Sequence, residues 1–210
     1  VSVTANVQGT WQIEMVVQNN GPTDVIVDIA DDSTDVTLFR GIQNVTGEYT
    51  ITKRPTLKGT GTTTLASGTA DRVVFDVTAT GGSAGDIVVF GSVKGFDGVT
   101  SDIVFDDTGD AGTGTFLVQT PANMQINAIH LSQNTVTQNQ TAEWQVRVEV
   151  ENSGQADVRL TSDALLLTDA IGYIIQGPSG LVSGSDTLRG ETVDTLLYRV
   201  TQTGSGVGDN

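Results

Sequence analysis

The chain has 210 residues, 37% of them apolar, which is enough to fill the core of one large β-domain or two modules of ordinary size. Its 25 acidic residues outnumber 10 basic ones, and a formal charge of −15 repels nucleic acid and anionic lipid. Cysteine is absent, which excludes a disulfide framework and a thiolate metal site.

No run of residues approaches the roughly 20 apolar positions of a membrane span, so we expect no direct membrane insertion. The chain begins at Val1, without an initiator Met or a signal peptide. We therefore expect a mature or excised segment whose anchor and secretion signal lie outside it.

Short apolar runs follow one another at intervals of about ten residues, with Gly, Asn, Asp and Ser between them. Several alternate apolar and polar residues, the period of a half-buried strand. Helical spacing occurs only over residues 164–171, which is too short. In chain order, the expected strands are 11–17, 25–29, 36–39, 49–52, 73–77, 87–93, 103–105, 116–118, 124–131, 144–150 and 196–200. This pattern predicts an all-β sandwich of two sheets.

The chain also matches itself. The run WQIEMVVQNNG beginning at Trp11 aligns without a gap on WQVRVEVENSG beginning at Trp144, a shift of 133 positions. The pattern of residues 64–86 recurs at 187–209 with a shift of 123 positions, and Tyr198 aligns with Phe75. The difference of 10 is a loop-sized deletion between the two blocks.

This repeat predicts two tandem immunoglobulin-like β-sandwich modules, 1–119 and 124–210, joined by a short linker, 120–123. Residues 1–6 correspond to 134–139, so the first module lacks the N-terminal strand that 124–131 give the second. The second module lacks C-terminal strands, the counterparts of 87–118. Two explanations stay open: the chain is part of a longer repetitive protein, or a neighbouring molecule supplies the strands by complementation.

The second module carries a family resemblance. Its turn TVTQNQT at 135–141 and the strand that ends in ENSG at 151–154 resemble the CARDB-like Ig-fold repeats of bacterial and archaeal surface proteins. Residues 64–78 look like a later strand of the same repeats. The resemblance implies adhesion or stalk modules of large exported proteins, and it does not cover the Asp-rich segment between Gly91 and Gly114.

No arrangement of residues predicts catalysis. His130 is the sole histidine and lies in an expected strand, where a sheet-margin residue is a simpler interpretation than a general base. No Gly-x-Ser-x-Gly elbow occurs. We therefore expect no enzyme activity and no required cofactor.

Two groups of aspartates are candidates for Ca²⁺, which takes six to eight oxygen ligands from flexible Asp and Gly loops. The first contains Asp28, Asp31, Asp32 and Asp35, and the second contains Asp97, Asp102, Asp106, Asp107 and Asp110. The sharpest candidate site is Asp106, Asp107 and Asp110, although the closing Glu of an EF-hand is lacking. The alternative is a set of solvated acidic loops on the surface.

Asn44 and Asn139 each begin an Asn-x-Thr sequon, so both are candidate glycosylation sites if the host attaches N-glycans. Trp11 and Trp144 lead the apolar face of the same strand in both copies, which predicts that they pack in the core. An exposed, flat indole would instead favour carbohydrate binding.

Taken together, these features predict a non-enzymatic structural or adhesive repeat segment of an extracellular, prokaryotic surface protein or filament. Its expected partners are adjacent repeats or neighbouring copies of the same protein, with surface glycans or other surface proteins as further candidates. The alternative is a carbohydrate- or ligand-binding accessory module of an exported enzyme.

Overall fold

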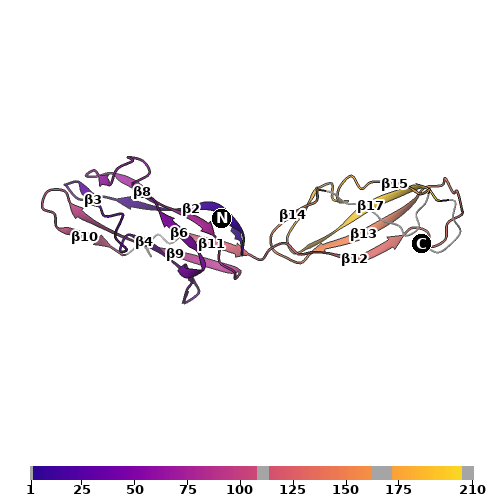
Figure 1. Cartoon of the computed structure of the whole chain (residues 1–210), viewed down its shortest axis with the longest axis horizontal. Helices are drawn as coiled ribbons and strands as arrows, with labels where there is room; N and C mark the ends of the chain where they lie inside the picture. The colour runs from indigo at the N-terminus through magenta and orange to yellow at the C-terminus, as the bar shows by residue number, and fades with distance from the viewer. Residues whose placement is uncertain (1, 108–113, 162–171, 205–210) are drawn as a thin grey trace. The chain divides into compact units, whose positions relative to one another are not determined.

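The computed structural model describes residues 2–107, 114–161 and 172–204. The chain divides into two compact units, unit 1 (Val1–Gln119) and unit 2 (Thr120–Asn210) (Figure 1). The described residues form strands and one 3₁₀ turn, η1 (Thr46–Glu48), and they contain no α-helix. None of them lies in a helix that is long and apolar enough to cross a membrane. The short helical pattern at 164–171 lies outside the described residues.

The described residues of unit 1 form two sheets. The smaller has the strand order β2 (Gln8–Gln18), β8 (Ala70–Ala79), β6 (Thr50–Lys53). The larger is built around the long strand β9 (Gly85–Asp97). Its other members are β1 (Ser2–Thr4), β3 (Val25–Val27), β4 (Asp35–Arg40), β5 (Gln43–Asn44), β7 (Thr64–Leu65), β10 (Ile103–Asp106) and β11 (Gly114–Gln119).

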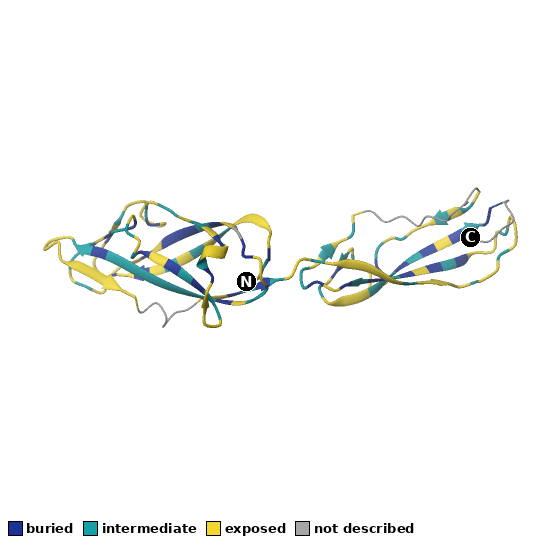
Figure 2. Cartoon of the chain, turned by 60° about the horizontal axis from the view of Figure 1, so that its bottom comes forward, coloured by how far each residue is buried: buried dark blue, intermediate teal, exposed yellow. Residues whose placement is uncertain are grey.

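The core of unit 1 is formed by side chains that the two sheets point at each other. Phe75 of β8, Leu38 of β4 and Ile87 of β9 are fully buried, and Figure 2 shows buried positions alternating with exposed ones along the strands. The alternation lets each strand give one face to the core and one to solvent. The predicted all-β sandwich is thus confirmed.

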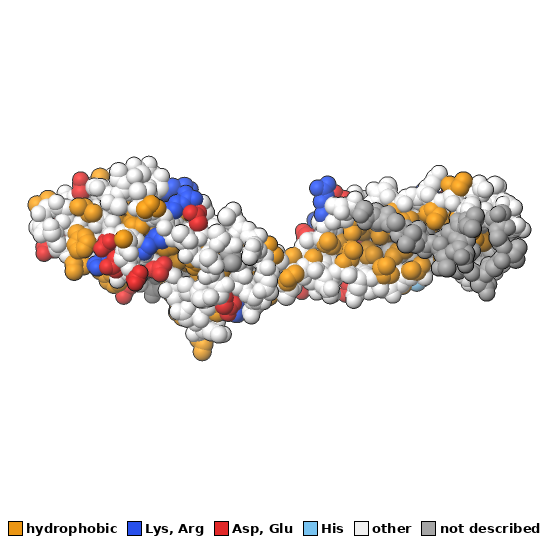
Figure 3. Space-filling view, in the orientation of Figure 1, with side chains coloured by type: hydrophobic (Ala, Val, Ile, Leu, Met, Phe, Trp, Pro, Cys, Tyr) orange, Lys and Arg blue, Asp and Glu red, His pale blue; other side chains and the backbone are white. Residues whose placement is uncertain are grey.

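Unit 2 is built on one sheet with the order β12 (Met124–Leu131), β13 (Trp144–Asn152), β17 (Thr192–Gln202), β15 (Ile174–Gln176). A pair of short strands, β14 (Val158–Arg159) and β16 (Thr187–Leu188), contributes Leu188 to the same core. Figure 3 shows hydrophobic side chains gathered on one face of this unit. The exposed apolar residues of β12 are Met124, Ile126, Ile129 and Leu131.

The two units share their strand registers. Trp11 of β2 pairs with Val77 of β8, and Trp144 of β13 pairs with Val200 of β17, as the two sequence shifts require. The β3–β7 and β14–β16 pairs correspond in the same way. The internal repeat of the sequence is therefore also a repeat of backbone pairing.

A buried asparagine lies where the long strand ends in both units: Asn19 directly follows β2, and Asn152 is the last residue of β13. Asn19 Nδ2 donates hydrogen bonds to the carbonyls of Thr23 and Leu65 at 2.8 and 3.1 Å. Asn152 makes the equivalent two bonds at 2.8 and 3.4 Å, and its side chain is fully buried. This amide connects the turn that follows the strand to the opposite sheet, because it satisfies carbonyls from both.

The residues expected to form a linker belong to unit 2. Thr120 O accepts a hydrogen bond from Ala156 N at 3.0 Å, and Asn123 O accepts one from Ser153 N at 3.0 Å. Residues 120–123 therefore run beside the turn after β13, and the boundary between the units falls between Gln119 and Thr120. Pro121 predicts an interruption of strand pairing at this segment. The hydrogen-bond partners of the segment lie some thirty residues further along the chain, at 153–156.

The buried amide gives a first prediction. Asn152→Ala leaves two carbonyls and two N–H groups without their partner, and we expect it to lower the free energy of unfolding of unit 2 by about 2–3 kcal/mol. Denaturant unfolding in a Trp11→Phe background measures this, since Trp144 fluorescence then reports unit 2. The matched control is Asn134→Ala, at an exposed position. A loss as small as that of the control would contradict the role given to Asn152.

Candidate functional site

Unit 1 has an apolar groove along the open edge of β2. Among the described strands, β2 pairs only with β8, whereas its counterpart β13 is flanked by both β12 and β17. The groove has a volume of about 910 Å³ and follows β2 and the turn after it from Trp11 to Thr23. Its opposite wall comes from β9, β10 and β11.

The facing walls of this groove carry several apolar side chains. Ile13 and Met15 are half-buried and Val17 is buried on the β2 side, while Val93 and Val104 lie on the opposite wall. The sulfur of Met15 lies 2.6 Å from where a Cβ on Gly91 would be, so glycine at position 91 allows Met15 to pack against β9. An unpaired strand edge beside an apolar groove is the usual arrangement for binding an added strand.

The repeat shows which backbone groups face the open edge. In unit 2, Ser132 N donates to Gln145 O at 2.9 Å and Gln145 N donates to Ser132 Oγ at 2.8 Å, so the peptide groups of Gln145 point toward the β12 side. Gln12 is the equivalent residue in unit 1, and β2 has the same register on β8. Alternate residues of β2, starting at Gln12, therefore direct their N–H and C=O groups to the open edge.

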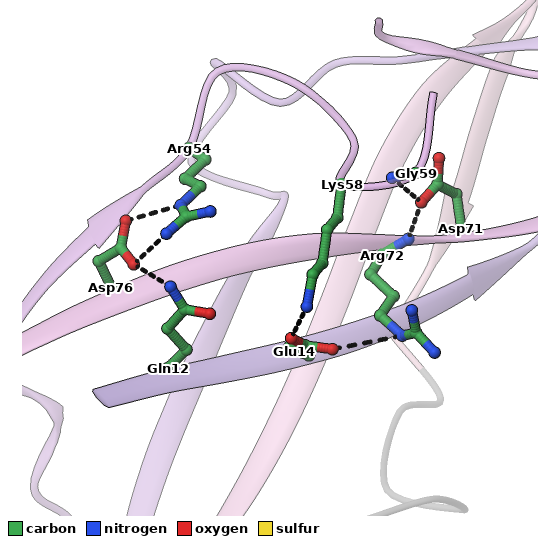
Figure 4. A network of polar contacts seen from close by, with 8 residues as sticks. All are labelled: Gln12, Glu14, Arg54, Lys58, Gly59, Asp71, Arg72 and Asp76. Carbon is green, nitrogen blue, oxygen red and sulfur yellow. Dashed lines mark hydrogen bonds and ion pairs between the residues drawn. The ribbon is translucent and has the colours of Figure 1, made fainter. Parts of the chain in front are cut away.

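The other face of the β2–β8 pair is polar (Figure 4). Arg54 donates two hydrogen bonds of 2.8 Å to the carboxylate of Asp76, and Gln12 Nε2 donates a third of 2.8 Å. The bond from Arg54 lowers the pKa of Asp76 below its usual value. Glu14 is paired with Lys58 on the same face. The sheet thus has one solvated face and one apolar face, and the groove lies on the apolar side.

The predicted calcium site falls only partly within the described residues. Asp106 ends β10 and Asp107 follows it, both with exposed side chains, while Asp110 lies outside the described residues. Within the described ranges, no three His, Cys, Asp or Glu side chains are placed to hold a metal ion. Calcium binding by this segment stays a prediction.

Two other aspartates of the acidic groups are held by hydrogen bonds within unit 1. Asp31 pairs with Lys94 Nζ at 2.5 Å, and this bond is the main reason that the pKa of Asp31 is held far below its usual range. Asp97 accepts hydrogen bonds from the Thr23 hydroxyl and from the backbone N–H groups of Val99 and Thr100, each of the latter at 2.8 Å. The Thr23 bond is the largest cause of lowering the pKa of Asp97 to about 2. Both carboxylates therefore stabilise turns of the fold.

The tryptophans lie on the core side, as predicted. Trp144 is 7% exposed. Trp11 is half-buried and meets Phe116 edge-on, with ring centroids 4.9 Å apart and planes at 63°. Neither indole offers the flat, exposed platform that carbohydrate binding needs. His130, exposed on β12, pairs with Arg147 in the strand ladder.

Both sequon asparagines are exposed. Asn44 lies on β5 and accepts a hydrogen bond from Thr46 N at 3.0 Å through its Oδ1 atom. Asn139 adopts a positive φ of 56° in a turn, and its N–H donates to Gly204 O at 3.1 Å. Their exposure is compatible with glycosylation, which stays a prediction for both.

Comparison with known proteins adds no family. No protein-family model matches the chain, and no curated protein matches it. The secreted serine protease VesC from Vibrio cholerae aligns at 14% identity and a TM-score of 0.27, over 99% of this chain and 46% of that protein. A Porphyromonas gingivalis protein of unknown function aligns at 11% identity and a TM-score of 0.30, over 92% of this chain and 76% of the other. The titin domains z1z2, whose structure was solved in complex with telethonin, align at 15% identity and a TM-score of 0.26, over 99% of this chain and 78% of the other. Scores this low carry no conclusion about this chain.

The bonds to Asp97 predict a pH dependence. Its pKa in the folded chain, about 2, lies below the ordinary value of 3.8, so the stabilisation is complete above about pH 4 and is lost as the pH falls toward 2. The melting temperature of unit 1 should exceed that of an Asp97→Asn variant at pH 6, and the gap should narrow toward pH 2. Asp102→Asn, in the same turn region, is the control. A gap that is independent of pH would contradict this assignment.

The open edge of β2 gives a third prediction. Alternate amides of β2 starting at Gln12 should exchange with deuterium roughly tenfold or more faster than those starting at Ile13, which face β8. In β13, both sets of amides have strand partners and should be protected alike. Residue-resolved exchange by NMR measures both strands in one sample. Equal protection of the two sets in β2 would show that its edge is covered.

Proposed function

We propose that the chain is a non-enzymatic structural or adhesive segment of an extracellular surface protein or filament, built from immunoglobulin-like modules in series. The observation that carries the proposal is the shared pairing register of β2–β8 and β13–β17, together with the buried asparagine after each first strand. One structural unit used repeatedly in a chain is typical of proteins that build length.

The charge of the chain supports this role. With 25 acidic residues against 10 basic ones, neighbouring segments repel one another except where specific contacts are made. Such a surface keeps an extended, exported array soluble. The acidic side chains of the turns, such as Asp31 and Asp97, stabilise those turns through local hydrogen bonds.

The groove in unit 1 favours polypeptide binding over catalysis. About half of the residues that line it are apolar. Of the carboxylates among them, Asp97 is engaged by Thr23 and two backbone N–H groups, and Glu14 is paired with Lys58. A hydrolytic site would instead need a nucleophile and a base within hydrogen-bond distance of each other. The apolar surface beside an unpaired edge is suited to contact with another β-strand.

The test is the location of the protein on cells of its source organism. Antibodies raised against this chain should label intact cells in immunogold electron microscopy, and brief protease treatment of intact cells should remove the label. A cytoplasmic protein measured in the same cells controls for lysis. Labelling that appears only after the cells are broken would reject the proposal.

A further inference from the structure

We propose that the open edge of β2 is an acceptor for one uncharged β-strand of the β12 type, taken from another copy of the repeat and running antiparallel to β2. The inference rests on the proposed function, in which such repeats occur in series. Beyond that function, it specifies the binding site, the strand register and the kind of strand that is bound. In unit 2, β12 occupies the equivalent position beside β13.

A glycine marks the path of the incoming strand. A Cβ on Gly154 would lie 1.9 Å from the carbonyl oxygen of Pro121, so the segment that leads into β12 passes directly over this residue. Gly21 is its counterpart in unit 1, where the one atom near a Cβ would be Oδ1 of Asn19, at 3.2 Å. Unit 1 thus has a glycine at the same place but no segment above it within the described residues.

The buried asparagine has an unused acceptor position in unit 1. Asn152 Oδ1 accepts hydrogen bonds from Gly154 N at 3.1 Å and from Asn123 N, in the segment before β12, at 3.0 Å. Asn19 Oδ1 accepts the bond from Gly21 N at 2.9 Å, and no second donor lies among the described residues. A carbonyl oxygen has two lone pairs, so Asn19 can receive the N–H of an added strand.

Backbone donors of the following turn show the same difference. In unit 2, the N–H groups of Ser153 and Ala156 donate to carbonyls of the segment 120–123. Their counterparts in unit 1, the N–H groups of Asn20 and Thr23, have no hydrogen-bond acceptor within the described part of the chain. One bond has no equivalent, because Pro22 has no N–H where Gln155 donates to the hydroxyl of Thr120 at 2.9 Å.

The register of β12 fixes how the strand would fill the groove. Ile126, Ile129 and Leu131 pair with Val150, Val148 and Val146 of β13. Residues that pair directly across a ladder project from the same face. By the repeat, the three apolar side chains would lie opposite Val17, Met15 and Ile13, which line the groove.

Charge disfavours an acidic strand at this edge and is compatible with a strand of the β12 type. Residues 114–142, which include β12, contain no Asp, Glu, Lys or Arg. Asp97 and Asp106 lie on the groove wall, so an acidic strand would be repelled and a neutral one would not. Edge strands of soluble proteins are commonly protected by lysine, and β2 contains none.

The experiment titrates the full chain with a synthetic peptide of residues 120–133, TPANMQINAIHLSQ. We expect saturable one-to-one binding by calorimetry, a raised melting temperature of unit 1, and slower exchange of the β2 amides that face the open edge. The control peptide carries Ile126→Asp and Ile129→Asp. It should bind at least roughly tenfold more weakly, because two side chains that would enter the groove become charged.

A variant of the chain tests the geometry of the acceptor. Gly21→Ala puts a methyl group where the incoming segment must pass, so it should weaken peptide binding by roughly tenfold or more. The melting temperature without peptide shows whether the variant itself folds normally. Gly47→Ala, where a Cβ meets no atom within 4 Å, is the matched control and should bind the peptide as the parent chain does.

Absence of saturable binding would overturn the proposal, and so would equal binding of the two peptides or an unchanged affinity of the Gly21→Ala chain. Dimerisation of the chain through β2 without peptide binding would also overturn it, because the occupant would then be a folded second molecule. The surface labelling described above is independent of these results. If the peptide does not bind but intact cells are labelled, the acceptor site is rejected and the proposed function stands.

Discussion

The pairing of one long strand with another, β2 with β8 and β13 with β17, determines where the remaining elements of each unit lie. Each pair offers an apolar face to the core, and a buried asparagine at the end of its first strand holds the next turn against the opposite sheet. Losing that amide would leave buried carbonyls without partners, which is costly in an interior of low dielectric. The same asparagine supports the turn over which the segment before β12 passes in unit 2.

The two units differ in what surrounds this shared pair. In unit 1, strands β9 to β11 cover the apolar face of β2 and β8, but no described strand pairs with the outer edge of β2. In unit 2, β12 covers the edge, and its apolar side chains, such as Ile126 and Ile129, remain exposed. Unit 1 therefore exposes the strand edge that is covered in unit 2, and unit 2 exposes apolar side chains on the side of the sheet that strands β9 to β11 cover in unit 1. Exposed apolar surfaces of this size are typical of interaction sites, and the proposal assigns them to strand pairing between repeats.

Most of the strands could be predicted from the sequence, because period-two alternation is a local signal. Residues 124–131 form β12 with the expected bounds, and the repeat located the equivalent pairs on β8 and β17. The hydrogen bonds between the segment 120–123 and residues 153–156 could not be predicted, because they join residues some thirty positions apart that no local pattern connects. Pro121 predicts an interruption of strand pairing, and residues 120–123 lie in no strand.

The candidate site was only partly visible in the sequence. The missing counterpart of 124–131 indicated an open edge, but the groove needed the opposite wall, including Val93 and Val104, which no pattern places near β2. Gly21 is matched by Gly154 in the repeat, but only the structure shows why a glycine is needed there, since the backbone of Pro121 passes over Gly154. The sequence makes the aspartates candidate ion ligands, but it does not show that Asp31 bonds to Lys94 or that Asp97 bonds to Thr23, because these partners are distant in the sequence.

The central claim is that unit 1 is a module of the same kind as unit 2 with its edge strand unfilled. The most direct measurement joins a second copy of residues 120–133 to the chain immediately before Val1, the position that the shift of 133 assigns to them, and follows amide exchange along β2. The account predicts that the amides of Gln12, Glu14 and Val16 become protected and that unit 1 melts at a higher temperature than in the parent chain. Unprotected amides and an unchanged melting temperature would contradict it.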